Sequence, residues 1–221
     1  MTKSHRPKPI KFFWWILGCA SMEELLVGLQ KLHCATNAEP VDLIHKVLHV
    51  ATEMLRARGC ADVQVPPNDS ELYARINGQE AILVGGPTPL TRIFFHTEDR
   101  VAVKYIRTIM EGSAFERTII ISIDGPTSFA RKESAVYGSS IQFFRYKDLS
   151  VNITKHVCVP KHAKVAESTD IGVDKDKCPK MLQTDAVAAY YDFQPGDVVS
   201  VDRRFGTTDV APFFRLVVNA T

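Results

Sequence analysis

The stretch Leu149-Ser-Val-Asn-Ile-Thr-Lys-His-Val-Cys-Val-Pro-Lys-His162 decides how the rest of this sequence is interpreted. From Leu149 to Val159 the odd positions are apolar, with Lys155 as the exception, and the even positions up to His156 are polar. A period of two places one apolar face inward, so the pattern predicts a β-strand. Pro160 lacks the N–H that a ladder needs, so we expect this strand to end there or to lie at a sheet edge.

Length, charge and cysteine content set broad limits. A chain of 221 residues with 45% hydrophobic and 24% charged residues suits one large folded domain or two modest ones. The formal net charge is +2, but four basic residues supply +4 within the first eleven positions, which leaves −2 for the remainder. The body is therefore not a basic nucleic-acid binder by charge alone. Five widely spaced cysteines without a C-x-x-C pair favour reduced thiols in an intracellular protein over disulfides or structural zinc.

The first forty residues form a basic and apolar extension. Its apolar run, Phe12 to Gly18, is much shorter than the ~20 residues of a membrane span, so we expect no membrane partner. The same run imitates an export signal, and Ile16-Leu-Gly-Cys19 imitates a lipoprotein cleavage box. Docking of the aromatic residues on the body is the favoured interpretation. Either Met1 or Met22 can be the true start, and leucines after Met22 recur at helical spacing.

Between residues 41 and 147, helical and strand patterns alternate. Apolar residues at helical spacing predict a helix from Val41 to Arg58, and Gly59 suits the left-handed position after it. Val65 to Asp69 is interpreted as a turn-rich connection. The remaining expected elements are strands over 80–84, 92–96, 117–123 and 140–146, and helices over 99–110 and 127–137. This order predicts a mixed sheet flanked by helices. His45 and His49 could reach one metal ion, but no third ligand lies nearby, so we expect no metal.

Three motifs of the second half occur together in one family. The pattern Asn152-Ile-Thr-x-His156-x-x-Val-Pro160-x-His162 resembles the start of the assembly module in the fifth shared subunit of eukaryotic nuclear RNA polymerases and in its archaeal counterpart. The runs 179–191 and 213–218 resemble the family's next two motifs, in the same order. The resemblance implies a small α/β assembly module at 148–221 that docks on the largest polymerase subunit. It assigns the shaping of the docking surface to Pro160, His162, Asp185, Tyr190, Gly196 and Arg215.

The first half resembles the jaw domain of the same subunit. Val101 to Arg107, the strand from Thr118 to Ile123 and the turn Gly125-Pro-Thr-Ser-Phe-Ala-Arg-Lys132 carry this likeness, the last with its residue types in a different order. The resemblance implies a jaw at 41–147 with restriction-endonuclease-like topology, and it places Arg131 and Lys132 near downstream DNA. A nuclease of that fold needs a carboxylate two residues before a lysine on one strand. No lysine of this chain has one, so we expect no catalysis.

Departures from the family pattern concern partner contacts more than the fold. Only fifteen residues separate His162 from Cys178, where the family carries a longer segment with a charged helix, and Asp192 replaces a glycine.

His156, Cys158 and His162 could be imagined as metal ligands, although structural roles are favoured. The resemblance thus implies a mixed α+β chain, in the nucleus, that acts without a cofactor as a non-catalytic polymerase subunit. Its partners would be the largest subunit, other polymerase subunits and downstream double-stranded DNA.

Three alternatives stay open at this point. The chain can be a specialised paralogue confined to one polymerase instead of a subunit shared by polymerases I, II and III. It can also be a free-standing interaction protein that kept the fold. A membrane-attached protein that uses Phe12 to Cys19 is the third.

Overall fold

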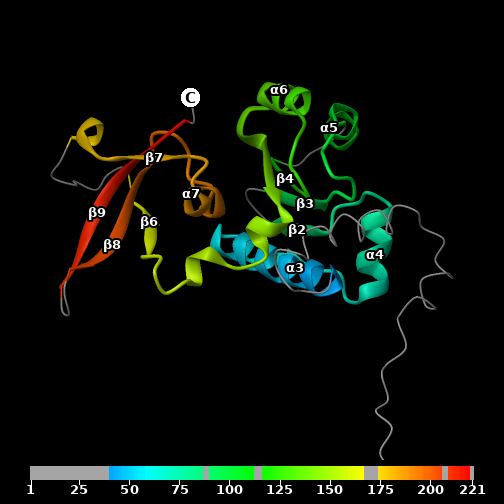
Figure 1. The fold of residues 1–221 in the computed structure, drawn as a ribbon, viewed down its shortest axis with the longest axis horizontal. Coiled ribbons are helices and arrows are strands. Elements are labelled where there is room, and N and C mark those ends of the chain that lie inside the picture. Colours follow the sequence, from blue (N-terminus) through cyan, green and yellow to red (C-terminus); the bar gives the residue numbers. More distant parts are fainter. Residues whose placement is uncertain (1–39, 87–89, 112–115, 167–173, 206–208, 220–221) are drawn as a thin grey trace, which may run out of the picture.

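Two β-sheets, each with its own helices, make up the part of the chain that the computed structural model describes (Figure 1). That part comprises residues 40–86, 90–111, 116–166, 174–205 and 209–219. The expected extension, the helix after Met22 and the apolar run from Phe12 lie outside it. Within the described residues, no helix is both long enough and apolar enough to cross a membrane.

The larger sheet has five strands in the order β1-β2-β3-β4-β5. The first three strands pair antiparallel, whereas β3, β4 and β5 pair in parallel, so the sheet is mixed as predicted. Residues of the central strands are almost all buried, which explains why β3 and β4 each contain three consecutive apolar residues instead of an alternation. The strand bounds are β1 Asp62–Gln64, β2 Leu83–Gly86, β3 Thr91–Phe95, β4 Arg117–Ser122 and β5 Ile141–Arg145.

Helices cover both faces of this sheet (Figure 1). The long helix α3, Pro40–Ala57, packs its apolar row on one face, in a core that includes Ile119 and Ile121. Helices α5, Val103–Met110, and α6, Ser128–Val136, pack on the other face with Ile120. Gly59 follows α3 with a φ of +94°, so the predicted left-handed position is confirmed.

One short helix of the first half was not predicted. Helix α4 spans Asp69–Asn77, directly after the connection that was interpreted as turn-rich. The Asn68 side chain caps it by accepting a hydrogen bond of 2.8 Å from the Glu71 N–H. Only Leu72 and Ile76 of this helix are buried, and two apolar positions are too few to give a helical period.

The smaller sheet has four strands in the order β6-β8-β9-β7. Its strands are β6 His162–Lys164, β7 Lys180–Leu182, β8 Val198–Phe205 and β9 Asp209–Val218. Helix α7, Ala186–Tyr191, packs Val187 and Ala188 on one face of this sheet, against Val199, Val201 and Val217. In Figure 1, α7 lies between the two sheets. The predicted mixed α+β fold class is therefore confirmed.

The strand predicted over 149–159 is wrong. Short 3-10 turns, η2 at Tyr146–Leu149 and η3 at Ile153–Lys155, occupy much of the stretch, and β6 begins only at His162, after Pro160. The apolar row does not face one core, because Leu149 is buried whereas Val151 and Val157 are exposed. His156 and Cys158 therefore do not share a strand face. Polar residues with short side chains favour local turns over a ladder, and Asn152 provides the contacts described below.

Candidate docking surfaces

Asn152 connects the segment 150–157 to both halves of the chain. Its side-chain oxygen accepts hydrogen bonds from the Thr154 N–H at 3.0 Å and the Thr154 hydroxyl at 2.6 Å, which fixes the turn η3. Its amide nitrogen donates to Glu53 Oε2 of α3 at 2.8 Å and to the Tyr190 hydroxyl of α7 at 3.0 Å. One buried amide thus joins α3, η3 and α7.

The Glu53 carboxylate is the charged partner in this arrangement. Lys155 Nζ contacts Glu53 Oε1, and His49 Nε2 lies 3.8 Å from the same oxygen. The hydrogen bonds from Lys155 and Asn152 hold the pKa of Glu53 below its ordinary value, against the opposing effect of burial. Glu53 is therefore an anion with its partners in place at neutral pH.

Helix α7 carries two of the predicted site residues. Asp185 is exposed and caps the helix, because its Oδ1 accepts a hydrogen bond of 2.9 Å from the Val187 N–H. Tyr190 is only 3% exposed and belongs to the core beneath α3. Burial raises the pKa of Tyr190. Tyr190 can therefore shape a docking surface only from beneath, by fixing the position of α7.

Arg58, just beyond α3, holds the end of α7. Its Nε donates to the Tyr190 carbonyl at 2.9 Å, and its Nη2 donates to the Ala189 carbonyl at 2.8 Å and to Gln142 Oε1 at 2.8 Å. The last carbonyls of a helix need such partners, and a cation suits the negative end of the helix dipole. Burial lowers the pKa of Arg58 to about 10, which leaves the guanidinium charged at neutral pH.

Asp192 ends α7 in a conformation that favours glycine. Its φ is +58°, in the left-handed region, which gives a physical reason for the glycine that the related family carries at this position. Its carboxylate lies 3.1 Å from Arg117 Nη2 of β4 and accepts a hydrogen bond of 2.8 Å from the Gln194 amide. The aspartate thus adds a third contact between the two halves of the chain.

Gly196 lies beside strand β9, and Arg215 lies within it. Gly196 forms an exposed turn with a φ of +93°, and its N–H donates to the Val217 carbonyl at 2.9 Å. Arg215 pairs in register with Val199 on β8. Its Nε atom is buried and has no hydrogen-bond partner among the described residues. A buried donor without an acceptor is costly. Because Val199 packs against α7, the Arg215 side chain lies on the α7 side of the sheet.

Pro160 and His162 fix the entry into β6. The His162 Nδ1 lies 2.8 Å from the Pro160 carbonyl, and His162 pairs with Val201 on β8. Both residues are partly buried. Within the described residues, no group of three histidine, cysteine, aspartate or glutamate side chains could hold a metal ion.

The four-stranded sheet leaves an apolar face partly exposed. Leu182 of β7 pairs with Val218 of β9, on the side opposite Met181 and Val217, which pack against α7. Leu182 is 50% exposed, and Val218 is partly buried. We call the side with Leu182 and Val218, together with Phe214 and Leu216 of β9, the open face. Leu216 pairs with Val198 on β8, and the Val198 side chain is buried. The open face is therefore covered at this point of β8.

Arg131 and Lys132 lie on the opposite half of the chain. Both side chains are exposed on α6, whose cap is Thr127: the Thr127 hydroxyl accepts a hydrogen bond of 3.2 Å from the Ala130 N–H. Phe129 in the first turn of this helix is also exposed, at 75%. The helix is as predicted, and proximity to DNA stays a prediction.

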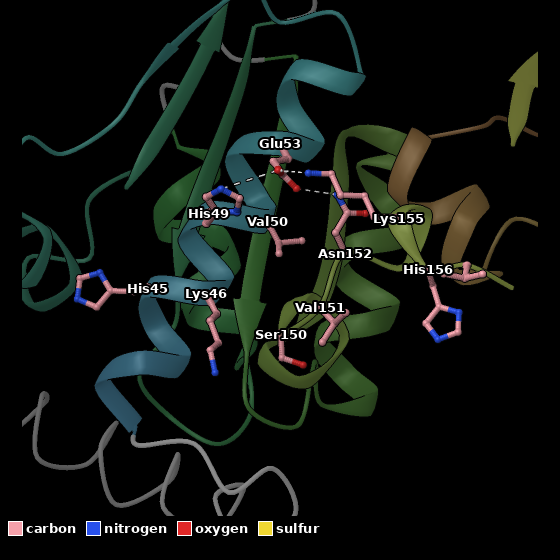
Figure 2. Close-up of a pocket in the computed structure, with 11 residues that line it drawn as sticks. His45, Lys46, His49, Val50, Glu53, Ser150, Val151, Asn152, Lys155 and His156 are labelled. Carbon is pink, nitrogen blue, oxygen red and sulfur yellow. Dashed lines mark hydrogen bonds and ion pairs between the residues drawn. The ribbon is translucent and has the colours of Figure 1, made fainter. Parts of the chain in front are cut away.

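A groove of about 760 Å³ lies between α3 and the segment 150–157 (Figure 2). His45, Lys46 and His49 line it from α3, and Val151, Lys155 and Val157 line it from the other side. The His45 Nε2 lies 3.7 Å from the Asp69 carboxylate, whereas His49 lies beside Glu53. The two histidines therefore have different carboxylate partners.

Comparisons with known proteins agree on one family. The model of the RNA polymerase Rpb5 C-terminal domain matches residues 151–217. Residues 151–217 are therefore similar to the carboxy-terminal domain of the Rpb5 family. The match contains all four strands of the smaller sheet except the last residue of β9, together with α7 and η3. The resemblance to the fifth polymerase subunit is thereby confirmed.

Individual relatives extend the similarity beyond this module. DNA-directed RNA polymerase V subunit 5A of Arabidopsis thaliana is 28% identical over 59% of this chain and 63% of its own length. A Dictyostelium discoideum subunit of RNA polymerases I, II and III is 29% identical over 60% of this chain and 74% of its own. The putative DNA-directed RNA polymerase subunit 454R of Invertebrate iridescent virus 6 is 24% identical over 74% of this chain and 96% of its own length. The chain thus spans a little under two thirds of the Arabidopsis relative.

Proposed function

We propose that this chain is a non-catalytic, Rpb5-type subunit of DNA-directed RNA polymerase. The observation that carries the proposal is the family match over 151–217, which coincides with a separate sheet and its helix. The names of the Arabidopsis, Dictyostelium and viral relatives as polymerase subunits support it. In this proposal, residues 148–221 anchor the chain on the largest subunit and contact other subunits.

The open face supports an anchoring role. Apolar residues on a partly exposed sheet face gain free energy when a partner removes them from water. Arg215 shapes the other side of the module, because it pairs in register with Val199, which packs against α7. Pro160, His162, Asp185 and Gly196 shape the edges of the same module, and Tyr190 fixes α7 beneath it.

The five-stranded domain would serve as the jaw near downstream double-stranded DNA, in the nucleus. The exposed cations Arg131 and Lys132 support this role, because basic side chains position proteins on DNA through phosphate contacts. Catalysis would belong to other subunits of the enzyme, and the chain itself would need no cofactor and no membrane.

A specialised copy of the subunit is the second candidate. The Arabidopsis relative is named for polymerase V alone, whereas the Dictyostelium relative is named for polymerases I, II and III. A free-standing interaction protein that kept the Rpb5 fold is the remaining alternative.

Affinity purification of the tagged chain from its native cells, followed by mass spectrometry, tests the proposal. Recovery of the largest subunits of all three nuclear polymerases would support a shared subunit, and recovery of one would support a specialised copy. Recovery of no polymerase subunit would overturn the proposal.

Matched variants test the anchoring surface separately. Leu182→Asp places a charge on the open face, and Val65→Asp places the same charge at a valine of the other half that is 40% exposed. We expect Leu182→Asp to reduce recovery of the largest subunit several-fold and Val65→Asp to leave it unchanged. Equal recovery with both variants would remove the open face from the proposal.

A further inference from the structure

The groove between α3 and the segment 150–157 carries exposed apolar surface. Val151 is 66% exposed and Val157 is 98% exposed, and both line the groove with the buried Val50. Two of the large apolar residues that the described chain exposes thus line one groove, and Figure 2 labels Val151 of this pair. Apolar side chains gathered in a groove with a polar rim are typical of a binding site for another molecule.

The charged residues of the groove leave an excess of positive charge. Lys46 forms no ion pair with any described residue, and its ammonium group projects from α3 at the rim (Figure 2). The second ammonium group, on Lys155, contacts Glu53, which is the one carboxylate among the lining residues. Glu53 also accepts from Asn152 and lies beside His49, so its charge is already shared among donors within the protein. A ligand therefore meets Lys46 and the histidines as cationic or donor groups.

We propose that this groove binds an acidic peptide segment of a partner protein, with an apolar side chain of the peptide seated against Val151 and Val157. Carboxylates of the peptide would face Lys46 and His49, because opposite charges at the rim steer and orient a partner. A purely ionic ligand, such as a free phosphate or a nucleic-acid backbone, would gain nothing from the apolar surface of the two valines. An acidic peptide with an apolar side chain therefore fits the groove better. This proposal does not depend on membership of a polymerase.

Other occupants fit the groove less well. The chain's own residues 1–39 carry five lysine and arginine residues against three glutamates, so their net charge of +2 opposes approach to Lys46. A second copy that met the groove through a two-fold axis would bring Lys46 and its equivalent toward the same apolar centre. Both occupants are outcomes of the experiment below.

Fluorescence anisotropy with the purified full chain tests the proposal. The probe is a labelled peptide in which Asp and Glu alternate with Leu and Phe. One control peptide has Lys at every acidic position, and another has Ser at every apolar position. We expect saturable binding of the first peptide only, weakened by added salt. Absence of binding up to about 1 mM, or equal binding of either control peptide, would overturn the proposal.

Matched protein variants test the location. We expect Lys46→Glu to weaken binding about three- to tenfold, because an exposed attraction becomes a repulsion. Lys104→Glu makes the same charge change on α5, across the five-stranded sheet, and should have no effect. Val157→Asp should weaken binding at least about tenfold, whereas Val136→Asp, at an α6 valine that is 81% exposed, should not. Equal effects within either pair would place the peptide elsewhere.

Two further measurements separate the alternative occupants. Tighter peptide binding after removal of residues 1–39 would show that the chain's own segment fills the groove. Self-association in analytical ultracentrifugation that Val157→Asp abolishes would show that a second copy fills it. Either result would overturn the proposal of an acidic partner.

Discussion

Replacement of Arg58 by methionine tests how the two sheets are held together. Arg58→Met keeps an unbranched apolar stem but removes the donors to the Tyr190 carbonyl, the Ala189 carbonyl and Gln142. The Ala189 carbonyl still accepts a bond of 3.0 Å from the Gln142 amide. Among the described residues, the Tyr190 carbonyl keeps no other donor. The main loss is therefore one unsatisfied carbonyl together with the charge at the end of α7.

The contacts allow the magnitude to be estimated. An unsatisfied buried acceptor costs about 1–3 kcal/mol, and loss of a cation at a helix carboxyl end costs a further ~0.3–1 kcal/mol. Removal of the guanidinium also removes its desolvation cost, which the lowered pKa of about 10 reflects, and this offsets part of the loss. We expect the free energy of unfolding to fall by about 2–3 kcal/mol, or the melting temperature to fall by about 4–12 °C.

Urea unfolding followed by circular dichroism measures this change, and amide hydrogen exchange locates it. Exchange should accelerate first in α7, whose carboxyl end loses its contacts. Arg56→Met is the matched control, because Arg56 is exposed near the end of α3, two positions earlier. Arg58→Lys should fall between the two, since lysine keeps the charge without the planar fork. An Arg58→Met protein within about 0.5 kcal/mol of the control would refute the reasoning, since surface substitutions usually lie in that range.

Two other perturbations test the remaining contacts between the halves. Because the hydrogen bonds from Lys155 and Asn152 lower the pKa of Glu53, its contribution to stability is complete above pH 4.5 and is lost as the pH falls through the lower folded value. The stability difference between the wild type and Glu53→Gln should therefore shrink below pH 4.5 in acid-unfolding curves, and a constant difference would argue against the ion pair. At Asp192, both Ala and Gly remove the contact with Arg117, but only Ala must hold a β-carbon at φ +58°. Asp192→Ala should be less stable than Asp192→Gly by about 1 kcal/mol in thermal unfolding, and the reverse order would contradict the left-handed assignment.

Elements with a sustained pattern could be predicted from the sequence. The apolar run of β4 and the helical row of α3 both have the length and residue types that identify buried elements. Asp185 and Gly59 were predictable because capping and left-handed positions select particular residues. In each of these cases the signal lies within the element itself or at its end.

The contacts between the halves could not be predicted in this way. Arg58 lies more than 130 positions from the carbonyls that it binds, and its sequence neighbours give no sign of them. The alternation over 149–159 was present but misleading, because the Asn152 side chain supplies the hydrogen bonds that a neighbouring strand would have supplied. Asp192 carried a usable signal, because the resemblance puts a glycine there. A residue with a β-carbon at a left-handed position benefits from an added contact, which Arg117 provides.

Helix α7 explains why the motif residues matter even where they are buried. Its Val187 and Ala188 belong to the core of the four-stranded sheet, whereas Tyr190 belongs to the core beneath α3. This short helix therefore contributes to two cores, and its orientation is fixed by Asn152 at one side and Arg58 at the other. If the smaller sheet anchors the chain and the larger sheet reaches a second partner, as we propose, the position of the second partner depends on this helix. Substitutions at Asn152 or Arg58 should then alter how the jaw is positioned before they alter the anchoring surface itself.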